Sequence, residues 1–517
     1  MMAVMTKTTI DAEVGFAAWA RNISQRTNRS LAGCRLIVPA NQQDDHNHAA
    51  SSALRQFSHA AAQWGMVVQP DDAEKKTSYN APEYTVHFND TVDTMFDSRN
   101  ASGYEAMAYA QAHMPVTARL IEELAHTVGF TGVRIAVCLI LEPKTAVLLR
   151  LLKAAGAIVG VCCESESTDQ RVADQLAGEG IIVEANASWS AQQSYQGALR
   201  LLDTIRPQII IDDGASFARL AAMERPQLFE NLIGVAEETT SGVRAFQAMQ
   251  DAGALTFPVI AVNDSMMKTG FDNAHGTGET CVTTMQRILG DDAFHDAHVA
   301  IIGYGPVGRG FAIRIRALGA HVTVCDIDPV AALSAVFDGF AARDIDEVLA
   351  DADMVVSATG VRHTITLDHM RHMHDGAVLS VIGGIANEIA LDDIPGFEAG
   401  VGHDALQLTV PDGPTLTLLA DGDGVNYTVG GGNPIEIMDL SFAVQVSAVA
   451  YLLRTRGTLE QGIHRLDRQA DQHIASIALE VRGFHASHDV TDNGYDWTMT
   501  RFVEDTRGNT TGEGENQ

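Results

Sequence analysis

The sequence predicts an α/β protein with two doubly wound parallel-sheet domains and a helical C-terminal segment. Two zones, residues 132–262 and 296–430, each alternate short apolar runs with amphipathic helical patterns. Strands this uniformly apolar, separated by helices, are typical of parallel sheets covered on both faces. Two such zones in one chain of 517 residues predict two domains with a cleft between them.

The strands are expected where apolar runs end at turn residues. In the first zone these runs are 134–139, 157–161, 181–184, 208–211 and 257–262. In the second zone they are 298–302, 321–325, 354–357 and 377–382. The first hundred residues carry no chemical motif, but runs 34–39 and 66–69 flank a helix-like stretch, 46–64, and could form a βαβ unit.

A glycine fingerprint opens the second zone, between an apolar run and a helical pattern. The next predicted strand ends at Asp326, eighteen residues beyond Gly308. Glycines allow the tight turn and close phosphate approach, and an acid at that strand end binds a ribose diol. An aspartate there repels a 2′-phosphate, so the cofactor is expected to be NAD. The predicted cofactor-binding residues of this loop and strand end are Gly303, Gly305, Pro306, Val307, Gly308 and Asp326.

Lysine is scarce, with six in the chain, and the last of them is Lys268. Asp272 and Asn273 follow within about one turn. A desolvated lysine can lose its charge and carry a proton, which arginine cannot do. An amine, a carboxylate and an amide beside a dinucleotide site indicate that a hydroxyl group is handled next to a nicotinamide. The alternative is a surface lysine near a helix start.

Charge and composition exclude several classes of partner. The net charge of −31 would repel the phosphates of nucleic acids and of anionic membranes. No apolar run approaches the about 18 residues that cross a bilayer, and the N-terminus lacks a secretory pattern. Six cysteines without CxxC spacing favour buried thiols in a reducing cytoplasm over zinc or disulfides. We therefore expect a cytoplasmic protein with no nucleic-acid or membrane partner.

Together these residues resemble the adenosylhomocysteinase (S-adenosylhomocysteine hydrolase) family. The resemblance covers most of residues 130–455, with a trace near 15–21 and 113–115. Its strongest segments are 212–214, 237–243, 263–273, 303–310 and 326–329. It implies an enzyme that binds NAD, oxidises the 3′-hydroxyl of a ribose, eliminates the 5′ substituent, adds water and reduces the sugar again.

The resemblance also implies a role for each matched residue. Lys268 and Asp272 would contact the hydroxyl that is oxidised, with Lys268 as proton acceptor, and Glu238 would hold the adjacent hydroxyl. Asn273 would act beside them and face the cofactor. Further expected cofactor contacts are Thr239, Thr240, Ser241, Gly383, Asn426 and Asn433, and Ser216 is an expected substrate contact.

The chain departs from the family pattern at several positions. A family histidine, threonine and glutamate read Ile140, Glu142 and Lys144 here. The Gly-Gly-Asp motif reads Gly-Ala-Ser at 214–216, and Asn-Ile-Gly-His reads Val-Ile-Gly-Gly at 381–384. Gly-His-Pro reads Gly-Asn-Pro at 432–434, and the tail lysine and tyrosine have no counterpart. The oxidising residues are retained, whereas those for adenine recognition and proton shuttling are largely replaced.

This pattern favours NAD-dependent oxidation of a secondary hydroxyl on a nucleoside-like or sugar-like small molecule. Elimination or hydration beside the ketone would be an extension, with Ser216 or Asn433 placing a proton or water. True S-adenosylhomocysteine hydrolysis and an NAD-responsive regulatory protein are the alternatives. The four retained residues Lys268, Asp272, Asn273 and Glu238 count against a purely regulatory role.

The expected organisation follows from the sequence pattern and from the same resemblance. We expect a substrate domain over 1–262 with a candidate insertion at 31–103, and an NAD-binding Rossmann domain over 280–432. Residues 433–481 would form helices returning to the first domain, and 482–517 a divergent, partly disordered tail. A homo-oligomer, dimer or tetramer, is implied. A histidine-rich run at His363, His369, His372 and His374 lies where the family has a surface helix, so no metal is predicted.

Overall fold

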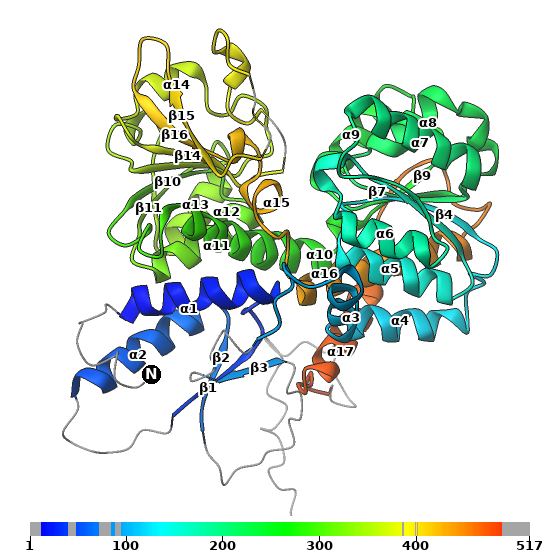
Figure 1. Ribbon diagram of the computed structural model, residues 1–517, viewed down its shortest axis with the longest axis horizontal. Coiled ribbons are helices and arrows are strands. Elements are labelled where there is room, and N and C mark those ends of the chain that lie inside the picture. Colours follow the sequence, from blue (N-terminus) through cyan, green and yellow to red (C-terminus); the bar gives the residue numbers. More distant parts are fainter. Residues whose placement is uncertain are drawn as a thin grey trace, which may run out of the picture.

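The computed structural model describes residues 12–39, 48–71, 84–87, 95–384, 387–398, 400 and 402–488. Two seven-stranded sheets form two lobes that stand side by side, and a three-stranded sheet lies beneath one of them (Figure 1). The predicted fold class, α/β with two doubly wound sheets, is confirmed.

The first large sheet is parallel throughout, in the order β17-β9-β8-β7-β4-β5-β6. Its strands are β4 (Arg134–Cys138), β5 (Ile158–Cys162), β6 (Ile182–Glu184), β7 (Ile209–Asp212), β8 (Gly234–Glu237), β9 (Pro258–Ala261) and β17 (Gly462–His464). Its helices include α5 (Pro143–Ala154), α6 (Gln170–Gly178), α7 (Ala191–Ile205), α8 (Ser216–Glu224) and α9 (Thr240–Asp251). The five predicted strands are confirmed to within two residues, and β8 and β17 were not predicted.

The second large sheet has the order β12-β11-β10-β13-β14-β16-β15, with only β15 antiparallel. Its strands are β10 (His298–Ile302), β11 (His321–Cys325), β12 (Ala341–Ala342), β13 (Met354–Ser357), β14 (Val378–Val381), β15 (Ala405–Thr409) and β16 (Thr415–Leu419). Its helices include α11 (Gly278–Leu289), α12 (Pro306–Ala317), α13 (Pro329–Phe337) and α14 (Leu367–Arg371). The four predicted strands are present, and the β15–β16 hairpin at the sheet edge was not predicted.

Two segments join the lobes. After β9 the chain runs through α10 (Met266–Lys268) and a π-helix (Thr269–Thr277) directly into α11. It returns through α15 (Val425–Thr428) to α16 (Ile435–Arg454). The lobes also touch where the Arg244 guanidinium donates to the carbonyl oxygen of Gly360, at 3.1 Å.

Helix α16 packs in the core of the first lobe. This helix is long and apolar enough to cross a membrane, which corrects the expectation that no segment of the chain is. However, 83% of its apolar stretch is buried inside the protein. Residues 433–481, expected to form helices, are not helical throughout. There Gly462–His464 pairs with β9, and α17 (Arg468–Val481) begins only after Asp467, whose carboxylate caps it.

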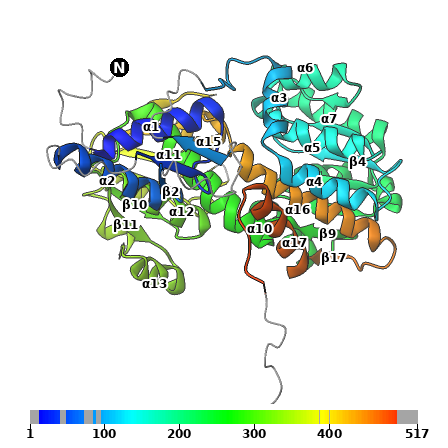
Figure 2. The same ribbon diagram turned by 90° about the horizontal axis from the view of Figure 1, so that it is seen from below.

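The N-terminal part forms a separate small unit, which we call the N-terminal module: α1 (Ala12–Thr27), β1 (Arg35–Val38), α2 (His48–Gln63), β2 (Val67–Pro70) and β3 (Thr85–His87). The predicted βαβ unit is present, and β3 adds a third parallel strand. Phe16 and Trp64 of the module share one apolar cluster with Phe311 and Val282 of the second lobe. Figure 2 shows α1 and α2 lying along this lobe. Helices α3 (Gly103–Ala112) and α4 (Pro115–Ala125) instead pack on the first lobe.

Candidate active site

The candidate site gathers where strands of the first lobe end and the chain crosses to the second. Strand β8 ends at Glu237, so Glu238 follows at the carboxyl edge of the sheet, where ligands of open α/β sheets bind. The crossing segment after β9 carries Lys268, Asp272 and Asn273. Its π-helical turn is a rare conformation that is frequently found at functional sites.

Lys268 and Asp272 form a buried ion pair. The Lys268 Nζ lies 2.7 Å from Asp272 Oδ2, and the two side chains are 5% and 8% exposed. Lys268 Nζ also donates to Asn273 Oδ1 at 3.0 Å. Burial disfavours the charged amine, but the carboxylates of Asp272 and Glu238 outweigh it and raise the pKa of Lys268. The amine is therefore a charged donor at rest.

Glu238 lies buried against α16. Ser441 Oγ and Gln445 Nε2 each donate a hydrogen bond to one of its carboxylate oxygens. Burial raises the pKa of Glu238 to about 7, helped by Asp272 and opposed by Lys268. This carboxyl group therefore changes protonation near neutral pH and can accept or donate a hydrogen bond to a ligand.

Asn433 connects this pair to the second crossing segment. Its Nδ2 donates to Asp272 Oδ1, and its Oδ1 accepts from Asn426 Nδ2 at 3.0 Å. Lys268, Asp272, Asn433 and Asn426 thus form one hydrogen-bonded chain. The buried Oδ1 of Asn426 has no hydrogen-bond partner within the described part of the chain.

Strand β10 leads into the glycine loop, where the backbone packs too closely to admit larger residues at two positions. Gly303 has φ +101°, and a Cβ on Gly308 would lie 2.1 Å from the Gly303 carbonyl oxygen. A Cβ on Gly305 would meet open space, so a pyrophosphate has room at the N-terminus of α12. The carboxylate of Asp326 accepts from Tyr304 N at 2.6 Å, which fixes the end of β11 beside this loop. These features, with the free Asn426 oxygen suited to a carboxamide N–H, fit NAD.

Other predicted residues are held by local structure. Thr239 caps α9 and donates to Glu237, and Ser241 Oγ lies 3.2 Å from the Thr239 hydroxyl. Thr240 Oγ1 donates to Asn263 Oδ1 at 3.0 Å. Ser216 begins α8 and is exposed, and no contact among the described residues joins it to Lys268.

Two buried groups at the site were not predicted as functional. Lys144, 1% exposed, pairs with Glu142 at 2.8 Å and donates to the Asn433 carbonyl oxygen at 2.6 Å. Two features of the sequence could have pointed to this pair: both residues depart from the family pattern, and lysine is scarce in the chain. Glu388 is fully buried against Gly383, where any Cβ would lie 1.8 Å from its Oε1. No motif in the sequence points to Glu388.

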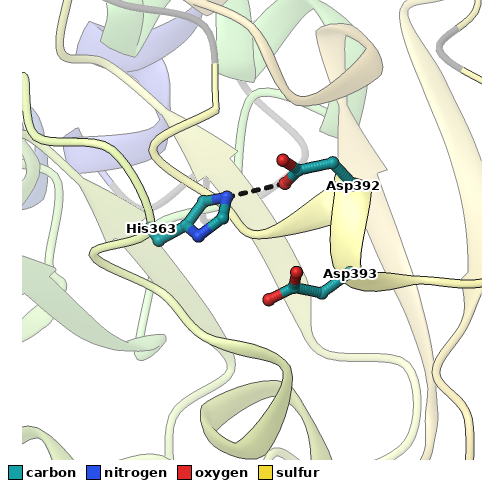
Figure 3. A group of neighbouring side chains, drawn as sticks. All are labelled: His363, Asp392 and Asp393. Carbon is teal, nitrogen blue, oxygen red and sulfur yellow. Dashed lines mark hydrogen bonds and ion pairs between the residues drawn. The ribbon is translucent and has the colours of Figure 1, made fainter.

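The histidine-rich run does not form one cluster. His363 Nε2 lies 2.6 Å from Asp392 Oδ1, with Asp393 beside them (Figure 3). Arg362 also pairs with Asp392 and so competes with any cation for that carboxylate. His369 and His374 face Asp346 and Asp353 instead. We assign no metal to this group.

A Rossmann-type sheet, a second α/β lobe and a buried lysine–aspartate pair at their junction define a two-domain NAD-dependent enzyme. Family models described as "S-adenosyl-L-homocysteine hydrolase" and "S-adenosyl-L-homocysteine hydrolase, NAD binding domain" match residues 95–225 and 273–432. The chain belongs to the S-adenosyl-L-homocysteine hydrolase family, and its cofactor is NAD.

Curated relatives agree with this assignment. The chain is 39% identical to the adenosylhomocysteinase of Thermococcus kodakarensis over 74% of its length and 91% of that protein. It is 37% identical to the S-inosyl-L-homocysteine hydrolase of Methanopyrus kandleri, over 74% and 91% respectively. The N-terminal module precedes the first family match, so the trace near 15–21 lies outside it, whereas 113–115 lies inside.

Proposed function

We propose that the protein oxidises a secondary, 3′-type hydroxyl of a nucleoside-like substrate. The observation that carries this proposal is the buried Lys268–Asp272 pair, to which Asn433 is hydrogen-bonded. All three residues lie on the two segments that join the NAD-binding lobe to the first lobe. Bound NAD supplies the acceptor for the hydride that leaves the substrate carbon. The protein's residues must then bind the hydroxyl and remove its proton.

The charge of Lys268 decides how that proton moves. An ammonium donates a hydrogen bond to the hydroxyl oxygen but cannot take up another proton. Lys268 therefore passes one of its own protons to the Asp272 carboxylate, 2.7 Å away, and takes the hydroxyl proton in its place, so Asp272 is the final acceptor. The role of Lys268 as initial acceptor, implied by the family resemblance, thus becomes a shared role of the pair.

Glu238 would hold the neighbouring hydroxyl. Its carboxylate is fixed by Ser441 and Gln445 and lies close enough to Lys268 to influence its pKa. Contacts at two points select a cis-diol over an isolated alcohol. Ionised Glu238 accepts from the second hydroxyl and so favours binding above neutral pH.

The test is the formation of NADH by the NAD-loaded protein, followed at 340 nm. Adenosine and inosine are expected to reduce the bound cofactor, whereas 2′-deoxyadenosine and 3′-deoxyadenosine are expected to leave it oxidised. If no diol-bearing nucleoside reduces the cofactor, the proposal fails.

A second candidate is complete hydrolysis of a nucleosyl-homocysteine, the activity for which the relatives are named. A ketone at C3′ would acidify the C4′ hydrogen and permit loss of the 5′ thiol. Asn433 can place a water molecule for this reaction but cannot itself carry a proton. Release of homocysteine and nucleoside, abolished by Lys268→Ala, would establish hydrolysis. Absence of both products would leave oxidation alone.

We further propose a homo-oligomer in the cytoplasm. Helix α13 supports self-association because its nine residues carry no charge in a chain of net charge −31. Its exposed apolar residues are Val330, Leu333, Val336 and Phe337. A purely regulatory NAD-binding role is disfavoured by the buried, fully partnered Lys268–Asp272 pair.

A further inference from the structure

The N-terminal module, which lies outside the family match, reaches the candidate active site through one short segment. We call residues 28–31, directly after α1, the N-terminal strap. Asn28 Oδ1 accepts from Lys144 Nζ at 2.8 Å, and Asn28 Nδ2 donates to the Gly431 carbonyl oxygen at 2.9 Å. The Asn28 carbonyl oxygen in turn accepts from Ile435 N at 2.9 Å. One residue thus holds both sides of the loop that carries Asn433.

The rest of the strap is anchored by buried acids from two other elements. Arg29 pairs with Glu436 of α16 at 2.5 Å, and Ser30 N donates to the same carboxylate at 3.0 Å. Leu31 N donates to Glu279 of α11 at 2.9 Å. Glu436 and Glu279 are 2% and 0% exposed. Buried charges this fully bonded fix the strap in one position.

From Asn28 a continuous line of polar contacts reaches the catalytic amine. Lys144 bonds both Asn28 and the Asn433 carbonyl oxygen, Asn433 bonds Asp272, and Asp272 pairs with Lys268. We propose that Asn28 is a positioning residue, through which the added N-terminal module holds Lys144 and the 431–433 loop in place for the reaction at Lys268.

Helix capping alone does not account for these contacts. Asn28 has φ +52°, and asparagine is one of the few residues that tolerate this left-handed conformation at the end of a helix. Glycine would serve the backbone equally well. The side-chain bonds to Lys144 and Gly431 are additional, so Asn28→Gly removes them while retaining the conformation.

The experiment compares NAD-loaded, full-length Asn28→Gly with wild type by hydrogen–deuterium exchange. Asp412→Gly, at an exposed left-handed turn of the β15–β16 hairpin, is the matched control. In Asn28→Gly we expect about fivefold faster exchange in peptides spanning 428–434 and 266–277, the size of effect expected for the loss of one hydrogen bond. In the control, exchange in these peptides should match wild type. Faster exchange confined to residues 24–35 would overturn the proposal, because it would reveal a local cap only.

A kinetic arm rests on the proposed function. At saturating nucleoside, Asn28→Gly should reduce the bound cofactor about tenfold more slowly, with NAD content unchanged, because misplaced groups slow the reaction. An unchanged rate despite faster exchange would contradict the positioning role. If wild type reduces no cofactor, the proposed function fails, and the exchange experiment still decides whether the strap holds the loop.

Discussion

Two buried carboxylates determine the state of Lys268 and therefore its part in the reaction. Asp272 bonds it directly, and Glu238 adds a second negative charge nearby. Removing the amine would leave Asp272 buried without its counter-charge. The amine is thus required for the chemistry and for the stability of the site.

Lys268→Met is expected to slow cofactor reduction at least about a hundredfold, the effect of losing a proton-transfer group. It should also lower the free energy of unfolding by about 3 kcal/mol, because one partner of a buried pair remains. Lys153→Met, at an exposed lysine of α5, is the control. Stopped-flow absorbance and urea unfolding measure the two effects. An unimpaired rate in Lys268→Met would exclude this lysine from the chemistry.

Glu238 gives the protein a dependence on pH near neutrality. Its folded pKa, about 7, lies above the usual carboxyl value of 4.5, so the folded state holds the proton more tightly. The stability due to this group is therefore complete below about pH 4.5 and is lost as pH rises through 7. Between pH 5 and 8, wild type should lose on the order of 2 kcal/mol relative to Glu238→Gln in urea unfolding. If the free energies of unfolding of the two proteins changed equally with pH, Glu238 would not have the raised pKa.

At the scale of elements, the π-helix and α12 approach each other unusually closely. A Cβ on Gly310 of α12 would lie 1.9 Å from the Ala274 carbonyl oxygen, in the segment that carries Asp272 and Asn273. Glycine at 310 therefore sets the position of both functional residues. The NAD-binding helix and the catalytic turn form one packed unit.

Gly310→Ala is expected to cost about 2 kcal/mol of stability through overpacking and to slow cofactor reduction. Gly178→Ala, in α6 where a Cβ would meet nothing within 4 Å, is the control. Thermal unfolding and single-turnover absorbance provide the measurements. If Gly310→Ala matches the control in both, the two elements are not mechanically linked.

The elements also show where sequence reasoning succeeds. Strands such as β4 and β10 were predicted because every residue after the first is apolar. Strand β17 was not, because its partner β9 lies about 200 residues away and the three residues carry no strand pattern of their own. The glycine loop and the Lys268 block were found as motifs. The contact of Asn28 with Lys144 was not, because only the tertiary fold brings them together.

At the scale of the whole molecule, the N-terminal module and α13 both lie on the NAD-binding lobe. The module buries its apolar helices there, whereas α13 leaves Phe337 83% and Val330 70% exposed. Exposed apolar faces of this kind mark association surfaces. A second copy of the chain is the proposed occupant.

Light scattering after gel filtration should show an oligomer for wild type and smaller species for the double variant Val330→Asp, Phe337→Asp. Charges on the helix would repel the already acidic partner copy. Met223→Asp, at an exposed methionine of the first lobe, is the control. An unchanged oligomer in the double variant would place the interface elsewhere.

Isotope transfer shows whether the hydride passes from a nucleoside carbon to the bound NAD. NAD-loaded protein would be mixed with adenosine deuterated at C3′, and the cofactor recovered for mass spectrometry. The reduced nicotinamide is expected to carry the deuterium, and Lys268→Met is expected to yield no labelled cofactor. Reduced cofactor without the label, or no reduced cofactor at all, would contradict hydride transfer from the nucleoside C3′ to NAD.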